Sequence, residues 1–338
     1  MAVLNSTILE KVWLNGSNDY MQRVPSPQQQ SYHDHVSAIF DPYNGDLFNV
    51  FTGLLNGIIG TYVEGKTFYN PLRAIKKDLD VTATYGFTER HIAVQYLQSR
   101  SYRAGSETLL KYEPPKFSEW YYSATEPRMY DFSWSRFDLQ RAFAQDGTGF
   151  SDLLDATISQ AISSDEYDEM MIMLQMFAEA ENSLDGGLFK HQLSAFPDTE
   201  ALGRELLAAI RANAGYMKFP TTRYNHLPIP VHETGETLVL FVCPDVMAYL
   251  DVMALATVFQ LDKANIQYRI IEVPEFPLPN VAAALCSEDF IWCRDAYYNL
   301  EPPFYNVDNL SYKYVLAHSE FLGVNPAANC CLFTYEAK

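Results

Sequence analysis

Three groups of residues in this 338-residue chain have types and spacings that could support chemistry. The first, His33-Asp34-His35, offers two imidazoles and a carboxylate, which are ligand types for zinc. A zinc site needs three or four ligands on a rigid support, whereas this triplet follows the Pro- and Gln-rich residues 24–30. We therefore favour a solvated loop, and we expect no metal ion and no other cofactor.

The second group is the vicinal pair Cys330-Cys331, which lies in an apolar run. Adjacent residues of a strand point to opposite faces, so these thiols cannot clamp one metal ion together. The odd number of cysteines and their apolar neighbours favour buried free thiols. All five lie in the last third of the chain: Cys243, Cys286, Cys293, Cys330 and Cys331.

The third group is the carboxylate run Asp165, Glu166, Asp168 and Glu169. Two of these could serve as acid and base in glycoside hydrolysis, which needs one carboxyl kept protonated by burial. The surrounding residues 142–189 contain ten Asp or Glu and no Lys or Arg. Such an acidic excess is more typical of a solvated helix face, so we expect surface carboxylates rather than a catalytic site.

The composition excludes several other functions. The net charge is −18, which is the wrong sign for a protein that tracks nucleic-acid phosphates. Glycine-rich phosphate loops, nucleophile elbows and HExxH zinc motifs are absent from the sequence. An N-terminal signal segment and a membrane-spanning apolar run are absent too, so we expect synthesis in the cytoplasm and no membrane partner. The 23 Tyr and 21 Phe favour either a Tyr-rich core or extensive interfaces.

The first half of the chain predicts an extended arm, a helix and a long loop. Residues 1–35 have the character of an arm, and residues 41–65 have helical spacing. Alternation around 90–98 and 120–122 predicts two strands that run out and back. The loop, residues 72–134, has nine Lys or Arg against eight Asp or Glu, so its charge is nearly balanced.

The second half predicts helices followed by a mixed region. Within 142–189, Ser163 and Glu166 have capping-box spacing, which predicts two helices or one helix with a break. Gly186-Gly187 should end this helical block. Another helix should follow Pro197 and stop near Gly215. The remaining expected elements are strands near 238–242, 268–273, 289–293 and 330–335, and a helix at 245–260.

The order of several sequence blocks resembles the major capsid protein of small short-tailed phages (podoviruses) of the phi-twenty-nine type. The most specific block is the strand–helix–strand unit 238–273, with Cys243-Pro244-Asp245 at its first corner. There are three further blocks. They are one that begins at Asn70-Pro71-Leu72-Arg73, one centred on the carboxylate run 165–169, and Asp289-Phe290-Ile291-Trp292. Closing strands follow near 312–318 and 332–333.

This resemblance implies an α+β protein with the Hong Kong ninety-seven fold of tailed-phage capsids. Its function would be structural: a virion protein that self-assembles into an icosahedral or prolate head shell around double-stranded DNA. We expect no further immunoglobulin-like domain of the kind some relatives carry. The implied segments are an N-terminal arm and first helix (1–69), an extended loop (70–134), a peripheral domain with the spine helix (135–218), and an axial domain with closing strands (219–338).

The resemblance also implies partners. The chain would contact itself in hexamers and pentamers, and would work with a scaffolding protein, a portal and packaged DNA. The loop's mixed charges suit contacts between subunits. The candidates are Lys76, Lys77, Arg90, Arg100 and Arg103, with Glu107, Glu113 and Glu119. The spine helix would lie along the inner side of the shell, so Asp165, Glu166, Asp168 and Glu169 become inner-surface candidates.

Two alternatives remain at this point. An encapsulin-type nanocompartment has the same shell fold and would enclose protein cargo instead of a genome. A carboxylate-dependent hydrolase is the alternative that the acidic run alone would suggest.

Overall fold

The computed structural model describes residues 4–28, 31–41, 43, 45–59, 68–77, 88–97, 99, 114–144, 146–184, 186–250, 269–306 and 311–336. The chain divides into two compact units, each built from three separate stretches. Unit 1 comprises Met1–Tyr69, Glu126–Asp168 and Tyr297–Ser319. Unit 2 comprises Asn70–Thr125, Glu169–Ala296 and Glu320–Lys338.

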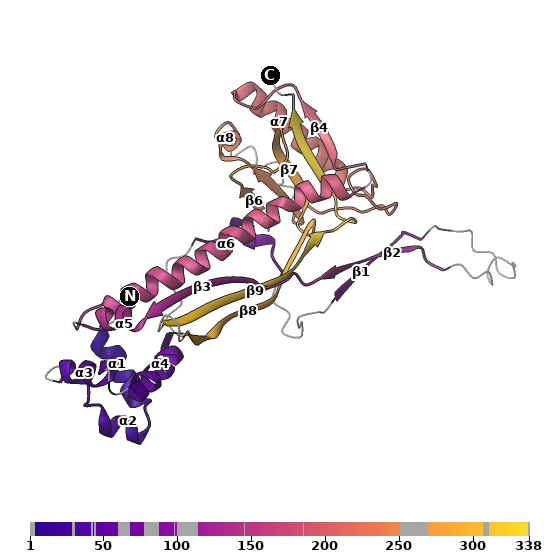
Figure 1. The fold of residues 1–338 in the computed structure, drawn as a ribbon. Coiled ribbons are helices and arrows are strands. Elements are labelled where there is room, and N and C mark those ends of the chain that lie inside the picture. The colour runs from indigo at the N-terminus through magenta and orange to yellow at the C-terminus, as the bar shows by residue number, and fades with distance from the viewer. Residues whose placement is uncertain are drawn as a thin grey trace. The chain divides into compact units, whose positions relative to one another are not determined.

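Unit 1 begins with four helices, which Figure 1 shows in indigo and violet. They are α1 (Asn5–Leu14), α2 (Asn18–Arg23), α3 (Tyr32–Phe40) and α4 (Gly45–Ile59). The helix expected within 41–65 is confirmed by α4. The expectation of an arm at 1–35 is wrong for α1 to α3, because their apolar residues are buried: Ile8, Leu9, Val12, Tyr20, Val36 and Ile39 are at most 8% exposed.

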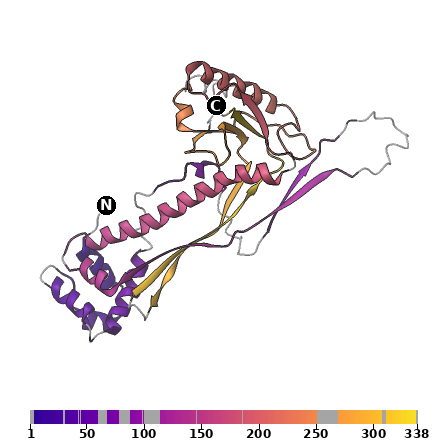
Figure 2. The same cartoon turned by 45° about the horizontal axis from the view of Figure 1, so that its top comes forward.

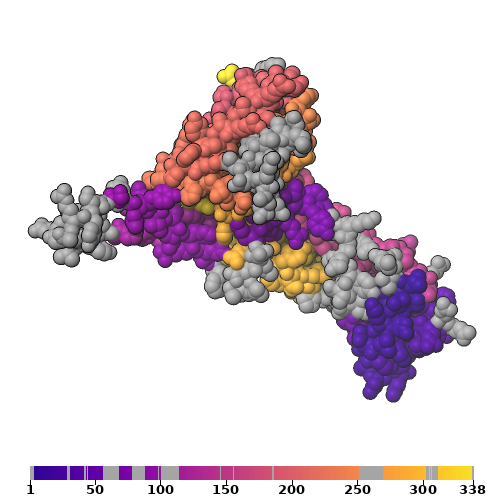
Figure 3. Space-filling view, turned by 180° about the vertical axis from the view of Figure 1, so that it is seen from behind, coloured from indigo at the N-terminus to yellow at the C-terminus, as the bar shows by residue number. Residues whose placement is uncertain are grey.

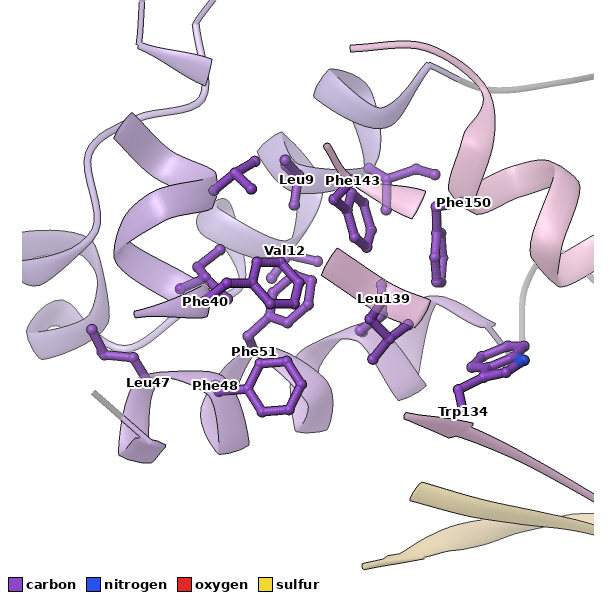
Figure 4. Close-up of a cluster of buried hydrophobic side chains, with 14 of the residues drawn as sticks. Leu9, Val12, Phe40, Leu47, Phe48, Phe51, Trp134, Leu139, Phe143 and Phe150 are labelled. Carbon is purple, nitrogen blue, oxygen red and sulfur yellow. The ribbon is translucent and has the colours of Figure 1, made fainter. Parts of the chain in front are cut away.

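An aromatic core joins these helices to α5 (Arg136–Ala142) and to the first turns of α6 (Gly149–Ser183). The rings of Phe51 and Phe143 meet edge to face at 5.6 Å, and Phe143 stacks on Phe150 at 4.7 Å. Figure 4 shows these rings pointing toward one another. Because edge-to-face and offset-stacked rings are the favourable geometries, this cluster adds specificity to the hydrophobic gain.

A three-stranded sheet contributes to the same unit. Its order is β3 (Arg128–Ser135), β9 (Ser311–Val324) and β8 (Ile291–Asn306). The pairing of β3 with β9 is antiparallel and runs from Arg128 opposite His318 to Ser135 opposite Ser311. Phe132 stacks on Tyr314 at 5.3 Å across this pair, as aromatic cross-strand neighbours do.

Helix α6 runs through 35 residues as one element (Figure 2). The expected capping box at Ser163 does not break it. Instead, the Ser164 hydroxyl donates to the Gln160 carbonyl one turn earlier, which leaves the helical backbone intact. The helix ends before Gly186 and Gly187, whose φ angles of +85° and +65° favour glycine, so the expected stop is confirmed.

Unit 2 contains a five-stranded mixed sheet in the order β4-β10-β7-β5-β6. The strands are β4 (Phe189–Leu193), β10 (Cys330–Tyr335), β7 (Val281–Ser287), β5 (Leu238–Val242) and β6 (Arg269–Glu272). Every residue of β5 and β7 is buried, as in a sheet covered on both faces. The strands expected near 238–242, 268–273 and 330–335 are confirmed. The strand expected near 289–293 is the start of β8, which begins at Ile291.

Two apolar clusters lie on opposite faces of this sheet. One face packs Phe241 and Cys330 against Phe177 of α6. The other packs Leu240 and Cys331 with α7 (Glu200–Met217). The expected burial of the thiols is confirmed for Cys286, Cys293, Cys330 and Cys331, but Cys243 is only partly buried. The opposite orientation of Cys330 and Cys331 is also confirmed.

The remaining elements of unit 2 are short. They are η1 (Pro71–Ile75), the hairpin strands β1 (Thr88–Val94) and β2 (Phe117–Ser123), and α8 (Pro244–Met247). The two strands expected in the loop are thus confirmed. The stop expected near Gly215 falls two residues early, because α7 continues to Met217. Most of the helix expected at 245–260 lies outside the described residues. Among the helices that are described, none has the length and apolar character to cross a membrane.

The expected solvated loop at His33-Asp34-His35 is wrong, since these residues form part of α3. His33 and Asp34 are exposed, but His35 is fully buried and its Nδ1 contacts the Pro25 carbonyl. Burial lowers the pKa of His35 below its ordinary value of 6.5, although the contact with Pro25 acts in the opposite direction.

This lowered pKa predicts an acid-sensitive unit 1. The unfolded chain binds a proton at His35 near pH 6.5 and the folded chain does not, so stability falls as pH drops below about 6.5. We expect His35→Gln to flatten that fall relative to wild type, measured as the urea midpoint between pH 7.5 and 5. His33→Gln, on the same helix but exposed, should leave it unchanged; equal slopes in all three proteins would contradict the prediction.

Candidate functional site

The hairpin of β1 and β2 is the most distinctive surface element of unit 2. The strands pair antiparallel from Thr88 opposite Ser123 to Val94 opposite Phe117. Alternate residues are covered and exposed along both strands, so the hairpin has an inner and an outer face. A two-stranded ribbon is only marginally stable alone, which makes the contacts of its inner face decisive.

The inner face is held by β8 through ion pairing and aromatic packing. The Glu89 carboxylate accepts hydrogen bonds from Trp292 Nε1 at 2.8 Å and from Arg294 Nη1 at 2.9 Å. The His91 ring lies edge-on to Trp292, with centroids 4.4 Å apart, and is stacked with Trp120 at 5.9 Å. We call these inner-face contacts the hairpin seat.

Tyr122 completes the hairpin seat. Its ring stacks on Trp292 at 6.1 Å, and its hydroxyl donates to the Val324 carbonyl at 3.1 Å while accepting from Trp120 Nε1 at 2.8 Å. Burial raises the pKa of Tyr122 well above its ordinary value, so the hydroxyl stays a donor. Gly323 provides the room, since a Cβ there would lie 2.6 Å from the Tyr122 ring.

The outer face is apolar and uncovered. Ile92, Val94, Phe117 and Tyr121 are between 50% and 57% exposed. Figure 3 shows the surface of the hairpin in purple from one side of the molecule. Arg90 pairs with Glu119 across the same face. Large apolar side chains gathered on one exposed face are typical of a surface that another molecule covers.

The two lysines that follow η1 were predicted to contact other subunits, but the Lys76 side chain already forms ion pairs within unit 2. Its ammonium lies 2.7 Å from Glu169 and 2.6 Å from Asp295, and its side chain is 11% exposed. Although burial alone would lower the pKa of Lys76, attraction by the two carboxylates raises it above the ordinary value. Lys77 is more exposed and pairs with Asp289 at 2.5 Å.

The prediction of a solvated carboxylate run is wrong for two of its four members. Glu169 is buried against Lys76, and Asp165 is buried 2.9 Å from His318 Nδ1 with Arg128 at 3.6 Å. Helical spacing explains this, because residues four apart lie on one face of a helix. Asp168 is exposed and accepts from the Tyr130 hydroxyl at 2.8 Å, while Glu166 is partly exposed.

Several predicted contact residues cannot be placed. Arg100, Arg103, Glu107 and Glu113 lie outside the described residues. Glu89, Trp292 and Arg294 are functional contacts that were not among the predicted residues. The alternation of Glu89 and His91 on one strand face was visible in the sequence, but the partner strand is about 200 residues away and carries no local signal.

The fold defines the class of protein. At a TM-score of 0.60, it is similar to the capsid structure of Staphylococcus phage Andhra, with 13% identity over 81% of this chain and 86% of that one. The capsid structure of cyanophage P-SCSP1u gives a TM-score of 0.52, with 12% identity over 78% of this chain and 87% of that one. These similarities show a mixed α+β capsid fold of the HK97 type, as expected.

Sequence comparison then gives the family. The chain belongs to the Phi29-like phage major capsid proteins, whose family matches residues 9–334. It is 24% identical over 285 residues to the major capsid protein of Streptococcus phage Cp-1, covering 81% of this chain and 76% of that protein. It is 26% identical over 282 residues to that of Bacillus phage GA-1, and there it spans only 58% of the relative.

Family membership resolves the alternatives. The protein is a structural component of the virion that forms the phage head shell by self-assembly, and it is not an enzyme. The encapsulin-type compartment and the hydrolase are thereby set aside. The buried carboxylates Asp165 and Glu169 accordingly act as structural ion pairs.

The Lys76 cluster makes a prediction about stability. Lys76→Met would remove the ammonium that lies between the Glu169 and Asp295 carboxylates, and we expect a loss of about 3–5 kcal/mol in unfolding free energy. The matched control is Lys77→Met, whose exposed pairs should cost less than about 1 kcal/mol. Urea denaturation of both variants measures the difference, and similar losses would show that burial of Lys76 does not matter.

Proposed function

We propose that the β1–β2 hairpin clamps a neighbouring subunit within the hexamers and pentamers of the shell. The observation that carries this proposal is the contrast between its two faces. The inner face is fixed by the hairpin seat, whereas Ile92, Val94, Phe117 and Tyr121 on the outer face remain uncovered. Burying such a face against a second copy would supply the apolar contact that the ribbon lacks.

The roles of the four consecutive segments belong to the same proposal. Residues 70–134 act as the extended loop, 135–218 as the peripheral domain and 219–338 as the axial domain. Within residues 1–69, helices α1 to α4 take the place of the arm as a packed helical cluster. Of the predicted contact residues, Lys77, Arg90 and Glu119 remain candidates for subunit contacts, together with the residues outside the described part of the chain.

Charge substitutions on the outer face test the clamp. Ile92→Asp and Val94→Asp should fold with an unchanged melting temperature, since both side chains are exposed, yet reduce the yield of shells at least tenfold. The control is Thr88→Asp, which places the same charge on the same face at a position that is already polar. Electron microscopy and sedimentation count the shells; normal shells from both apolar variants would rule the clamp out.

We also propose that exposed carboxylates of α6 face the packaged double-stranded DNA and keep it from adhering to the wall. The support is the acidic bias of residues 142–189 together with the exposure of Asp168 and the partial exposure of Glu166. Like-charge repulsion would let the genome enter and leave freely. A scaffolding protein with basic groups could use the same surface during assembly, and a portal would occupy one vertex.

Separating exposed from buried carboxylates sharpens the DNA test. The double variant Glu166→Gln/Asp168→Asn should form normal shells but release DNA several-fold more slowly at low salt, with the difference fading at high salt. The control removes the same charge at the start of α7, as Asp198→Asn just before the helix together with Glu200→Gln in its first turn. Equal DNA release from wild type and both variants at low salt would contradict the proposal and show that these carboxylates only keep the helix surface solvated.

A further inference from the structure

Two buried thiols face each other inside the five-stranded sheet of unit 2. Cys286 of β7 and Cys330 of β10 are direct cross-strand partners, and both are fully buried. Their Sγ atoms lie 3.0 Å apart. Neither thiol has a part in the hairpin seat, in the Lys76 cluster or in the proposed contacts with DNA.

The backbone around this pair has the geometry that a disulfide needs. The next pair along the two strands, Ser287 and Asn329, is joined by a hydrogen bond from Ser287 N to Asn329 O at 2.9 Å. Cys330 N instead donates to the Tyr224 carbonyl at 2.9 Å, away from β7. Cys286 and Cys330 are therefore a non-hydrogen-bonded pair, for which Cα atoms are typically about 4.5 Å apart. That separation lies within the range of about 4.4–6.8 Å found in disulfides.

We propose that Cys286 and Cys330 are a disulfide-forming modification site, closed by peroxide once the protein leaves the reducing cytoplasm. One thiolate attacks an oxygen of hydrogen peroxide, which breaks the O–O bond and gives a sulfenic acid and water. The second thiol attacks that sulfur, the S–S bond forms, and a second water leaves. Two thiols lose two electrons and two protons, and one peroxide is reduced to two waters.

The surroundings make the reaction slow but selective. Burial raises the pKa of Cys330 well above the ordinary thiol value, which keeps the reactive thiolate scarce. Once one sulfur is oxidised, the other thiol is already in contact. Cys331 lies on the opposite face of β10, and Cys293 has the Glu320 carboxylate as its hydrogen-bond partner at 3.6 Å.

The disulfide would stabilise the folded protein. It would join strands whose cysteines are 44 residues apart in the sequence, and so restrict the unfolded chain. We expect the oxidised protein to melt roughly 5–10 °C higher than the reduced protein.

The experiment uses the purified full-length protein, incubated for hours with hydrogen peroxide or kept in dithiothreitol. Remaining thiols are alkylated, the protein is digested without reduction, and mass spectrometry identifies linked peptides. We expect a Cys286–Cys330 peptide only after peroxide, with a raised melting temperature that dithiothreitol reverses.

Matched variants assign the effect. Cys330→Ala should lose both the linked peptide and the peroxide-dependent shift, whereas Cys331→Ala, one residue away, should keep both. Should Cys330→Ala fail to fold, the wild-type peptide map decides alone. Separate alkylation of Cys286 and Cys330 after peroxide, oxidation of either one to a sulfinic or sulfonic acid, or linkage through another cysteine would overturn the proposal.

Discussion

The two-stranded hairpin has no core of its own, so it depends on contacts with other residues of unit 2. The hairpin becomes a defined element because Glu89, His91 and Tyr122 on its inner face meet Trp292 and Arg294. These contacts combine aromatic burial with a charge-assisted pair, so they fix both the direction and the position of the hairpin on β8. The same arrangement leaves the opposite face apolar and open, which is unfavourable for an isolated molecule and useful for a shell subunit.

Buried charge has a similar organising role. Glu169 meets Lys76 within unit 2, and Asp165 meets His318 and Arg128 within unit 1. Replacing such pairs by apolar residues is often tolerated, but removing one partner is costly. Each pair therefore specifies which segments come together. The carboxylates of the run 165–169 therefore divide into a buried, structural pair, Asp165 and Glu169, and a surface pair, Glu166 and Asp168.

The sequence predicted elements best where apolar patterning is strong and local. The continuous apolar run Leu238–Val242 forms a fully buried strand, as predicted. Cys330 and Cys331 point to opposite faces of their strand, as the alternation of strand residues predicted. Local signals misled where competing interactions decide. The Gln-rich residues near 28–30 obscured the helical spacing of Ile8 and Val12, and the Ser163 capping signal gave way to packing along α6. Burial of Asp165 depends on His318, 153 residues later, which no single-sequence pattern reports.

The strand order of the five-stranded sheet has a consequence for synthesis. Strand β10, the last in chain order, lies between β4 and β7 and pairs with both. A nascent chain can therefore hold β5, β6 and β7 together, but the sheet stays split until residues 330–335 have left the ribosome. A chain that ends before residue 330 lacks the strand that pairs with both β4 and β7, so β4 is cut off from the other three strands of the sheet.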